Sequence, residues 1–244
     1  MKVKIKIGIL GYVPHSSKIK KIKNWQSELF EIISVDEYNI DGNSDGLNWE
    51  YSDTKIEGQL PIRDREDIFI AVTNVPIQDA FYARPFSGNR VCLTYFGMAD
   101  ILILNNIPLK NLLLKVLYLV SLIYRKNGNQ IPLIRDNIKD THDDTRCCIF
   151  DFNGAQKAEV IYSTSKPQLC KSCIQSLTNN LTPGNRIELN LIDKIQVELD
   201  RVNKGFFFNI TDWIKKHPIQ AIIISSLTAI TLDIISHFIY EKMK

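Results

Sequence analysis

The residues of this chain best suited to chemistry are its cysteines, because four of the five lie between residues 147 and 173. Cys170 and Cys173 form a C-x-x-C pair. Two thiolates at that spacing can both reach one tetrahedral ion, and this is how many proteins build half of a zinc site. The pair therefore predicts a bound metal, with zinc as the expected ion.

The second half of the site is expected from the segment just upstream. Cys148 supplies one ligand, and the fourth comes from His142, Asp143 or Cys147. We take His142, Cys148, Cys170 and Cys173 as the predicted set. Four protein ligands leave no open position on the ion, so the expected role of the zinc is structural.

The same stretch resembles the distal part of the archaemetzincin pattern, which runs HExxHxxGxxH, then C-x4-C-x-M, then C-x-x-C. In this resemblance His142 falls at the third zinc-binding histidine and Cys148 at the second cysteine. Asp143 stands where the first cysteine belongs, and Phe150 replaces the methionine of the Met-turn. The resemblance covers roughly residues 3 to 176 and implies a metzincin-like domain with a structural zinc knot.

The chain departs from that pattern where the chemistry would occur. The helix expected to carry HExxH reads Leu117 to Tyr124 and contains no histidine and no glutamate. A zinc peptidase needs two imidazoles one turn apart and a carboxylate that takes a proton from the bound water. We therefore expect no peptidase activity, and interpret the domain as a pseudoenzyme. The carboxylates beside His142, including Asp151, leave a hydrolase with a different site as a weaker alternative.

Hydrophobic patterns predict the elements that would position these residues. We expect strands where short apolar or alternating runs occur, helices where the spacing is helical, and a loop in the turn-rich region 39–59. The expected strands are 3–13, 68–72, 90–96 and 101–104, and the expected helices are 22–33 and 109–124. The fold class is thus α+β, a mixed twisted sheet packed on helices, within a domain of residues 1–180.

After this domain we expect a helical stalk over 181–217 and a transmembrane helix over 218–244. Residues 219–240 are mostly apolar, with Asp233 as the one charge, and they are long enough to cross the hydrocarbon layer. Ser226, Asp233 and His237 are seven and four residues apart, so they share one helical face. A carboxylic acid in lipid needs a partner, which predicts self-association of this helix.

Composition and cysteine use predict where the protein works. A net charge of +3 gives no reason to expect nucleic acid as a partner. The lysines near the amino terminus alternate with apolar residues as in a strand, and no signal-peptide cleavage site follows. An odd number of cysteines suits a reducing compartment. We expect a single-pass protein of the cytoplasmic membrane with its folded domain in the cytosol.

These features lead to three hypotheses about function. The first is a catalytically inactive sensor and effector, triggered by a ligand or protein, whose C-terminal helix oligomerises and perturbs the membrane. This layout is typical of self-destruct effectors in bacterial anti-phage defence. The second is a scaffold or adaptor held by an inert anchor, and the third is the hydrolase with a site near His142.

Overall fold

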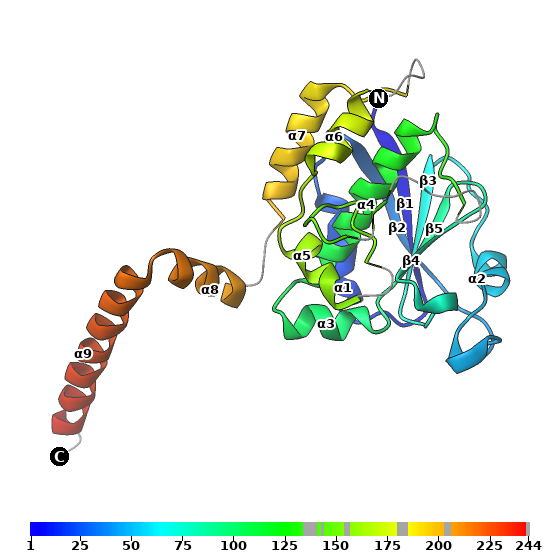
Figure 1. Cartoon of the computed structure of the whole chain (residues 1–244). Helices are drawn as coiled ribbons and strands as arrows, with labels where there is room; N and C mark the ends of the chain where they lie inside the picture. The colour runs from blue at the N-terminus through cyan, green and yellow to red at the C-terminus, as the bar shows by residue number, and fades with distance from the viewer. Residues whose placement is uncertain (134–140, 143, 154–156, 180–184, 203–205, 243–244) are drawn as a thin grey trace. The chain divides into compact units, whose positions relative to one another are not determined.

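The computed structural model of the 244-residue chain describes residues 1–133, 141–142, 144–153, 157–179, 185–202 and 206–242. It divides into two compact units, Met1–Asn203 and Lys204–Lys244. The first unit contains all of the β-structure found in the described residues (Figure 1).

A five-stranded mixed sheet forms the centre of the first unit. Its strands lie in the order β2-β1-β3-β5-β4. β1 pairs in parallel with β2 and β3, β3 pairs in parallel with β5, and β4 is the antiparallel edge strand. The strands are β1 (Val3–Leu10), β2 (Phe30–Tyr38), β3 (Ile68–Thr73), β4 (Ala83–Phe86) and β5 (Arg90–Thr94).

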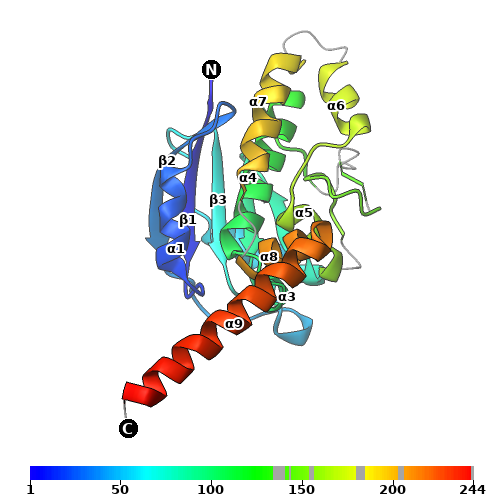
Figure 2. The ribbon, with the colours of Figure 1, turned by 90° about the vertical axis from the view of Figure 1, so that its left-hand side faces the viewer.

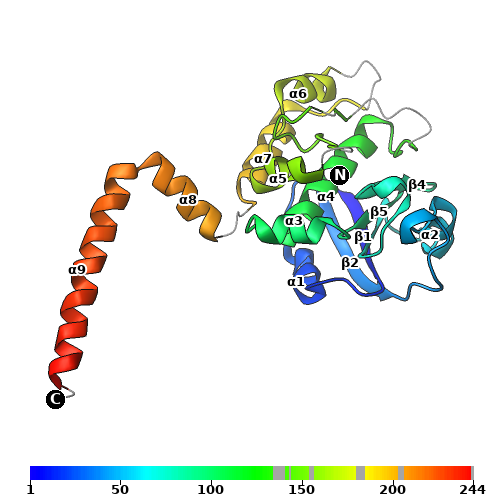
Figure 3. The ribbon, with the colours of Figure 1, turned by 60° about the horizontal axis from the view of Figure 1, so that its bottom comes forward.

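The sheet is buried on both faces, as the continuous apolar sequence of β3 requires. Ile68, Ile70 and Val72 belong to the larger core, on the face that carries most of the helices. Phe69 and Ala71, between them, belong to a smaller core on the opposite face, which Ile56 of the helix α2 (Asp53–Gln59) and Leu60 at its end help to fill. Figure 2 shows the sheet nearly edge-on, with α4 (Leu109–Lys126), α6 (Lys171–Thr178) and α7 (Leu189–Asp200) on the side of the larger core. Figure 3 shows α2 on the opposite side, next to β4 and β5.

Helix α4 is the central element of the larger core. It is the longest helix of the first unit among the described residues, and its side chains from Leu109 to Tyr124 are nearly all buried. This confirms the helix predicted over 109–124. The helices of this unit are α1 (Ser16–Lys20), α2 (Asp53–Gln59), α3 (Met98–Leu104), α4 (Leu109–Lys126), α5 (Val160–Ser165), α6 (Lys171–Thr178) and α7 (Leu189–Asp200).

Two predicted elements are wrong. The expected helix over 22–33 is a short 3₁₀ turn, Lys21–Asn24, followed by extended chain that becomes β2. Its apolar spacing also fits a strand, because Phe30 and Ile32 alternate with exposed residues. The expected strand over 101–104 is part of α3, where Met98, Ala99 and Leu102 are buried at helical spacing.

The region 39–59, predicted as a loop, contains two pieces of helix. A 3₁₀ turn spans Leu47–Trp49, and α2 spans Asp53–Gln59. Ser52 caps α2, because its side-chain oxygen accepts a hydrogen bond from the backbone N–H of Lys55 at 3.2 Å. The turn-forming residues of this region therefore include the cap of a short helix, which is why the region was predicted to be a loop throughout.

Helix α7 lies in the region predicted as a stalk, yet it is part of the folded body. Ile192, Ile195 and Leu199 on one face of α7 are buried in the larger core. The same core includes Ile187 and Val202, which flank the helix. The first unit consequently extends to Asn203, beyond the expected boundary at residue 180.

The second unit consists of two helices, α8 (Phe206–Lys216) and α9 (Pro218–Lys242). In the described part of the chain, the segment Pro218–His237 is the single unbroken helix long and apolar enough to cross a membrane. Its length and composition agree with the predicted span. The bent pair α3 and α4 is also apolar, but α4 is the buried core helix.

Candidate metal centre

One cluster of potential metal ligands occurs among the described residues, and it consists of His142, Cys148, Cys170 and Cys173. One ligand atom from each side chain lies within 4.8 Å of every other. These are the four residues taken from the sequence as the predicted zinc ligands. The structure therefore brings the predicted set together, and the binding of zinc to it stays a prediction.

Two isolated β-bridges and one helix start position the ligands. His142 is held by a bridge to Asp151, and Cys148 by a bridge to Gln168. Cys170 is the N-cap residue of α6, and Cys173 lies in the first turn of that helix. The C-x-x-C spacing across a helix start directs both thiols to the same point.

The geometry of the cluster suits a tetrahedral ion. Cys170 Sγ lies 3.7 Å from His142 Nε2. Zinc bonds of about 2.3 Å to sulfur and 2.0 to 2.1 Å to nitrogen, at a tetrahedral angle, separate two such atoms by about 3.6 Å. This pair of ligand atoms therefore already lies at the separation that a shared zinc ion requires. Bound there, the ion would join the 142–151 segment to α6, which is a structural contribution.

The structure also bears on the alternatives for the fourth ligand. Cys147 has a left-handed backbone conformation, with φ of 59°, and it is not a member of the cluster. Asp143, the other alternative, lies outside the described residues. His142 is the alternative that the structure places beside the three thiols.

A buried carboxylate orients the histidine. Asp151 is fully buried, and its Oδ1 lies 3.0 Å from His142 Nδ1. Its other oxygen accepts hydrogen bonds from the backbone N–H groups of Arg146 and Cys148, at 2.9 and 3.0 Å. A proton on Nδ1 then faces Asp151, which leaves the Nε2 lone pair free to face a metal.

Lys115 of the core helix α4 holds the backbone of Asp151, a contact that the sequence did not reveal. Its Nζ donates to the Asp151 carbonyl at 2.6 Å, to Ser163 Oγ at 2.8 Å and to the Tyr82 hydroxyl at 3.2 Å. Burial lowers the pKa of Lys115 to about 7, although the charge of Asp151 opposes the shift. The only signal in the sequence is one lysine within the apolar run 112–120.

The local environment separates the cluster thiols from the remaining buried thiol. The thiol of Cys173 and the backbone N–H of Cys170 donate to Cys148, and the pKa of Cys148 is lowered to about 5. Burial opposes a charge on His142, but the protonated ring donates hydrogen bonds to the sulfurs of Cys148 and Cys170, and the net result is a raised pKa. By contrast, burial raises the pKa of Cys92, in β5, to about 12. Cys148 is therefore prepared to bind a cation as a thiolate, whereas Cys92 stays a neutral thiol.

Helix α4 offers no histidine or glutamate for catalysis. Two buried polar side chains of this helix, Asn111 and Lys115, are one turn apart and contact other parts of the first unit. Asn111 donates to the carbonyl of Thr164 at 2.9 Å, so both side chains fix the position of α5 and the metal-binding segment.

Comparisons with known proteins show a similarity in structure to two archaemetzincins. The sequence has no match among protein-family models and none among curated proteins. The structure is similar to the archaemetzincin of Archaeoglobus fulgidus, with 18% identity and a TM-score of 0.37 over 71% of this chain and 99% of that one. It is also similar to the archaemetzincin of Methanopyrus kandleri, with 12% identity and a TM-score of 0.40 over 82% and 97% of the two chains.

The second predicted site is the polar face of α9. The helix is continuous from Pro218 to Lys242, so the spacing of Ser226, Asp233 and His237 puts them on one side of it. They lie in the second unit, and they form a face separate from the metal centre.

Proposed function

We propose that this chain is a membrane-anchored, catalytically inactive metzincin-like sensor and effector, whose helix α9 self-associates and perturbs the membrane. The observation that carries the proposal is the exposure of the apolar side chains of α9. Ile222, Leu232 and Ile234 are 65%, 61% and 63% exposed. So much apolar surface on one helix needs a covering, and lipid is the covering suited to a helix of this length.

The polar groups of α9 fall into two classes. The hydroxyls of Ser225, Thr228 and Thr231 donate to backbone carbonyls of the same helix at 2.8 to 2.9 Å, so they are satisfied within lipid. Ser226 and Asp233 have no such bond among the described residues. A carboxyl group at mid-membrane costs about 3 kcal/mol or more, and association of several copies reduces that cost by giving Asp233 polar neighbours.

Two features support an inactive rather than a catalytic domain. The core helix has no residues that could form HExxH, and the His142 cluster has four protein ligands with no position for substrate. The domain is left with a role in sensing. A folded sensor joined to one polar-faced span is the layout that we associate with anti-phage defence, and the trigger would be a ligand or protein in the cytosol.

The direct test is leakage of dye-filled lipid vesicles reconstituted with the full chain. We expect the wild-type chain to release dye and Asp233→Leu to release little, because leucine removes the need for polar neighbours. Thr231→Val is the matched control, since the Thr231 hydroxyl bonds within its own helix, and it should leak as the wild type does. Equal leakage from the wild type and Asp233→Leu would contradict the proposal.

The scaffold alternative is separated by exchanging residues 219–240 for an unrelated apolar helix. An inert anchor tolerates this exchange, whereas an effector loses its activity. Growth arrest and membrane depolarisation on expression are the measurements. Arrest that persists after the exchange would favour the scaffold.

A further inference from the structure

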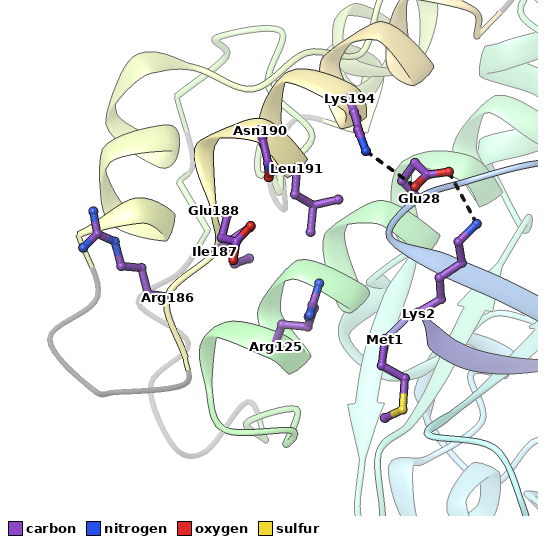
Figure 4. A pocket seen from close by; sticks show the side chains of 10 residues that line it. All are labelled: Met1, Lys2, Glu28, Arg125, Arg186, Ile187, Glu188, Asn190, Leu191 and Lys194. Atoms are coloured by element: carbon purple, nitrogen blue, oxygen red, sulfur yellow. Dashed lines mark ion pairs between the residues drawn. The ribbon is translucent and has the colours of Figure 1, made fainter.

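A surface cavity of about 630 Å³ lies where α7 meets the end of α4 and the start of β1. This volume is within the usual range for small-molecule sites. The lining, drawn in Figure 4, comes from four separate segments of the first unit: the amino terminus, the chain before β2, the end of α4, and α7 with the residues before it. The residues are Met1, Lys2, Glu28, Arg125, Arg186, Ile187, Glu188, Asn190, Leu191 and Lys194.

The charged side chains of this cavity are of both signs, with basic groups in excess. Lys2, Arg125, Arg186 and Lys194 are basic, and Glu28 and Glu188 are acidic. Arg125 extends from the end of α4 toward α7, while Arg186 points outward at the rim (Figure 4). A ligand that suits this lining carries negative charge at one part and hydrogen-bond donors at another.

Two of the basic groups are held only loosely. Lys2 Nζ lies 3.6 Å from one oxygen of Glu28, and Lys194 Nζ lies 3.8 Å from the other. Both pairs are solvent-exposed, and exposed ion pairs contribute little to stability. A bound anion can therefore attract both lysines without a large loss elsewhere.

Arg125 is the cation most available to a ligand. Within the described part of the chain it has no ion pair and no side-chain hydrogen bond. A guanidinium presents a planar fork of donors that matches a phosphate group in two hydrogen bonds. Its placement inside the cavity, facing α7, makes it the anchor for such a group.

We propose that this cavity binds a phosphate-bearing ligand of nucleotide size. Arg125, Lys2 and Lys194 hold the phosphates, and Glu188 accepts hydrogen bonds from hydroxyl or amino groups of the same ligand. The lining distinguishes a nucleotide from inorganic phosphate, which would leave Glu188 without a donor and facing a like charge.

The position of the cavity gives the ligand a way to influence α7. One turn past Lys194, the buried Glu198 accepts hydrogen bonds from Ser27 Oγ, the backbone N–H of Glu28 and the Tyr118 hydroxyl, at 2.7, 2.7 and 2.6 Å. Glu28 thus contacts α7 through its backbone and lines the cavity with its side chain. A ligand that draws Lys2 and Lys194 away from Glu28 would change the contacts between α7 and the segment around Glu28. Regulation of the membrane helix through α7 rests on the proposed function.

The test is isothermal titration of the full chain in lipid nanodiscs with adenosine triphosphate, adenosine and inorganic phosphate as separate probes. We expect the triphosphate to bind with micromolar affinity and the other two to bind at least tenfold more weakly. Arg125→Gln and Lys194→Gln should each weaken the triphosphate about tenfold, because each removes a charged contact. Lys23→Gln, on an exposed 3₁₀ turn away from the cavity, is the matched control and should bind as the wild type does.

Three results would overturn the proposal: no binding of the triphosphate, phosphate bound as tightly as the triphosphate, or unchanged affinity in Arg125→Gln. Arg125→Lys keeps the charge and the fold while losing the fork, so an affinity between those of the wild type and Arg125→Gln supports the assigned contact. Binding is measured separately from vesicle leakage. Failure of one proposal is therefore distinguishable from failure of the other.

Discussion

The two units of this protein treat apolar and polar groups in opposite ways. In Met1–Asn203 apolar residues are buried in two cores, and polar groups such as Lys115 and Glu198 are buried with hydrogen-bond partners. In Lys204–Lys244 the large apolar side chains of α9 are exposed, and Asp233 has no partner in the described residues. The first unit buries its apolar side chains against one another. The apolar side chains of α9 can be covered only by something outside the second unit, such as lipid or other copies of the chain.

The largest predicted effect is the loss of stability of the first unit when the metal centre is removed. We expect Cys148→Ser to abolish zinc binding and to lower the unfolding temperature by about 10 °C or more, because the thiolate is a ligand of an ion that connects two segments. Metal analysis and thermal unfolding measure both effects. About one zinc per chain is expected in the wild type.

Cys92→Ala and Cys147→Ser are the controls for this prediction. Neither side chain belongs to the ligand cluster, so both variants should keep the zinc. Loss of zinc from Cys147→Ser would show that the fourth ligand has been assigned to the wrong residue.

The next largest predicted effect is the loss of stability when the hydrogen bonds between α7 and the rest of the first unit are removed. Glu198→Ala removes the acceptor of the Ser27 and Tyr118 hydroxyls and of the backbone N–H of Glu28, and should reduce the free energy of unfolding by about 3 kcal/mol. Urea unfolding measures this. Asp200→Asn, an exposed change on the same helix, should cost less than about 0.5 kcal/mol. An equal effect of the two variants would argue against the buried carboxylate as the attachment point.

The orientation of His142 should affect metal affinity more than folding. Asp151→Asn keeps the size of the side chain but weakens the contact with Nδ1, and we expect a loss of zinc affinity between about 10-fold and 100-fold. Competition with a chromophoric chelator measures it. Asp144→Asn, at an exposed carboxylate 3.7 Å from the same nitrogen, should change affinity far less. Comparable losses would mean that the buried carboxylate has no special role.

The buried amine of Lys115 predicts how stability depends on pH. Its folded pKa is lowered to about 7 from an ordinary value of 10.5, so between these values the unfolded chain binds a proton that the folded chain does not. The free energy of unfolding therefore rises with pH across that window, by up to about 1.4 kcal/mol per pH unit. The difference in unfolding free energy between the wild type and Lys115→Met should show this slope. A flat difference would indicate an ammonium that stays charged in the fold.

The smallest expected effect is that of the second unit on the first. Asp233→Leu should leave the unfolding free energy of the body unchanged within about 0.5 kcal/mol, because the two units are separate compact bodies. Hydrogen exchange of the buried backbone amides of β1 and β3 measures the unfolding of the first unit alone. A large shift would contradict the independence of the two units.

The success of sequence reasoning in this chain depended on how local each pattern was. The metal ligands could be predicted because Cys170 and Cys173 carry their spacing within one helix start. The contacts of Lys115 with Asp151 and of Ser27 with Glu198 join residues 36 and 171 positions apart, so no local pattern reveals them. The region 22–33 failed for another reason, since its apolar residues fit both helical and strand spacing, and pairing with β1 decided between them.

The burial of α7 also constrains the order of events during synthesis. The core of the body is complete only when Ile195, Leu199 and Val202 have been added. Helix α9 follows after one short helix, so it leaves the ribosome almost as soon as the body can close. Delivery of α9 to a membrane, which the proposed function requires, would therefore coincide with the final folding of the first unit.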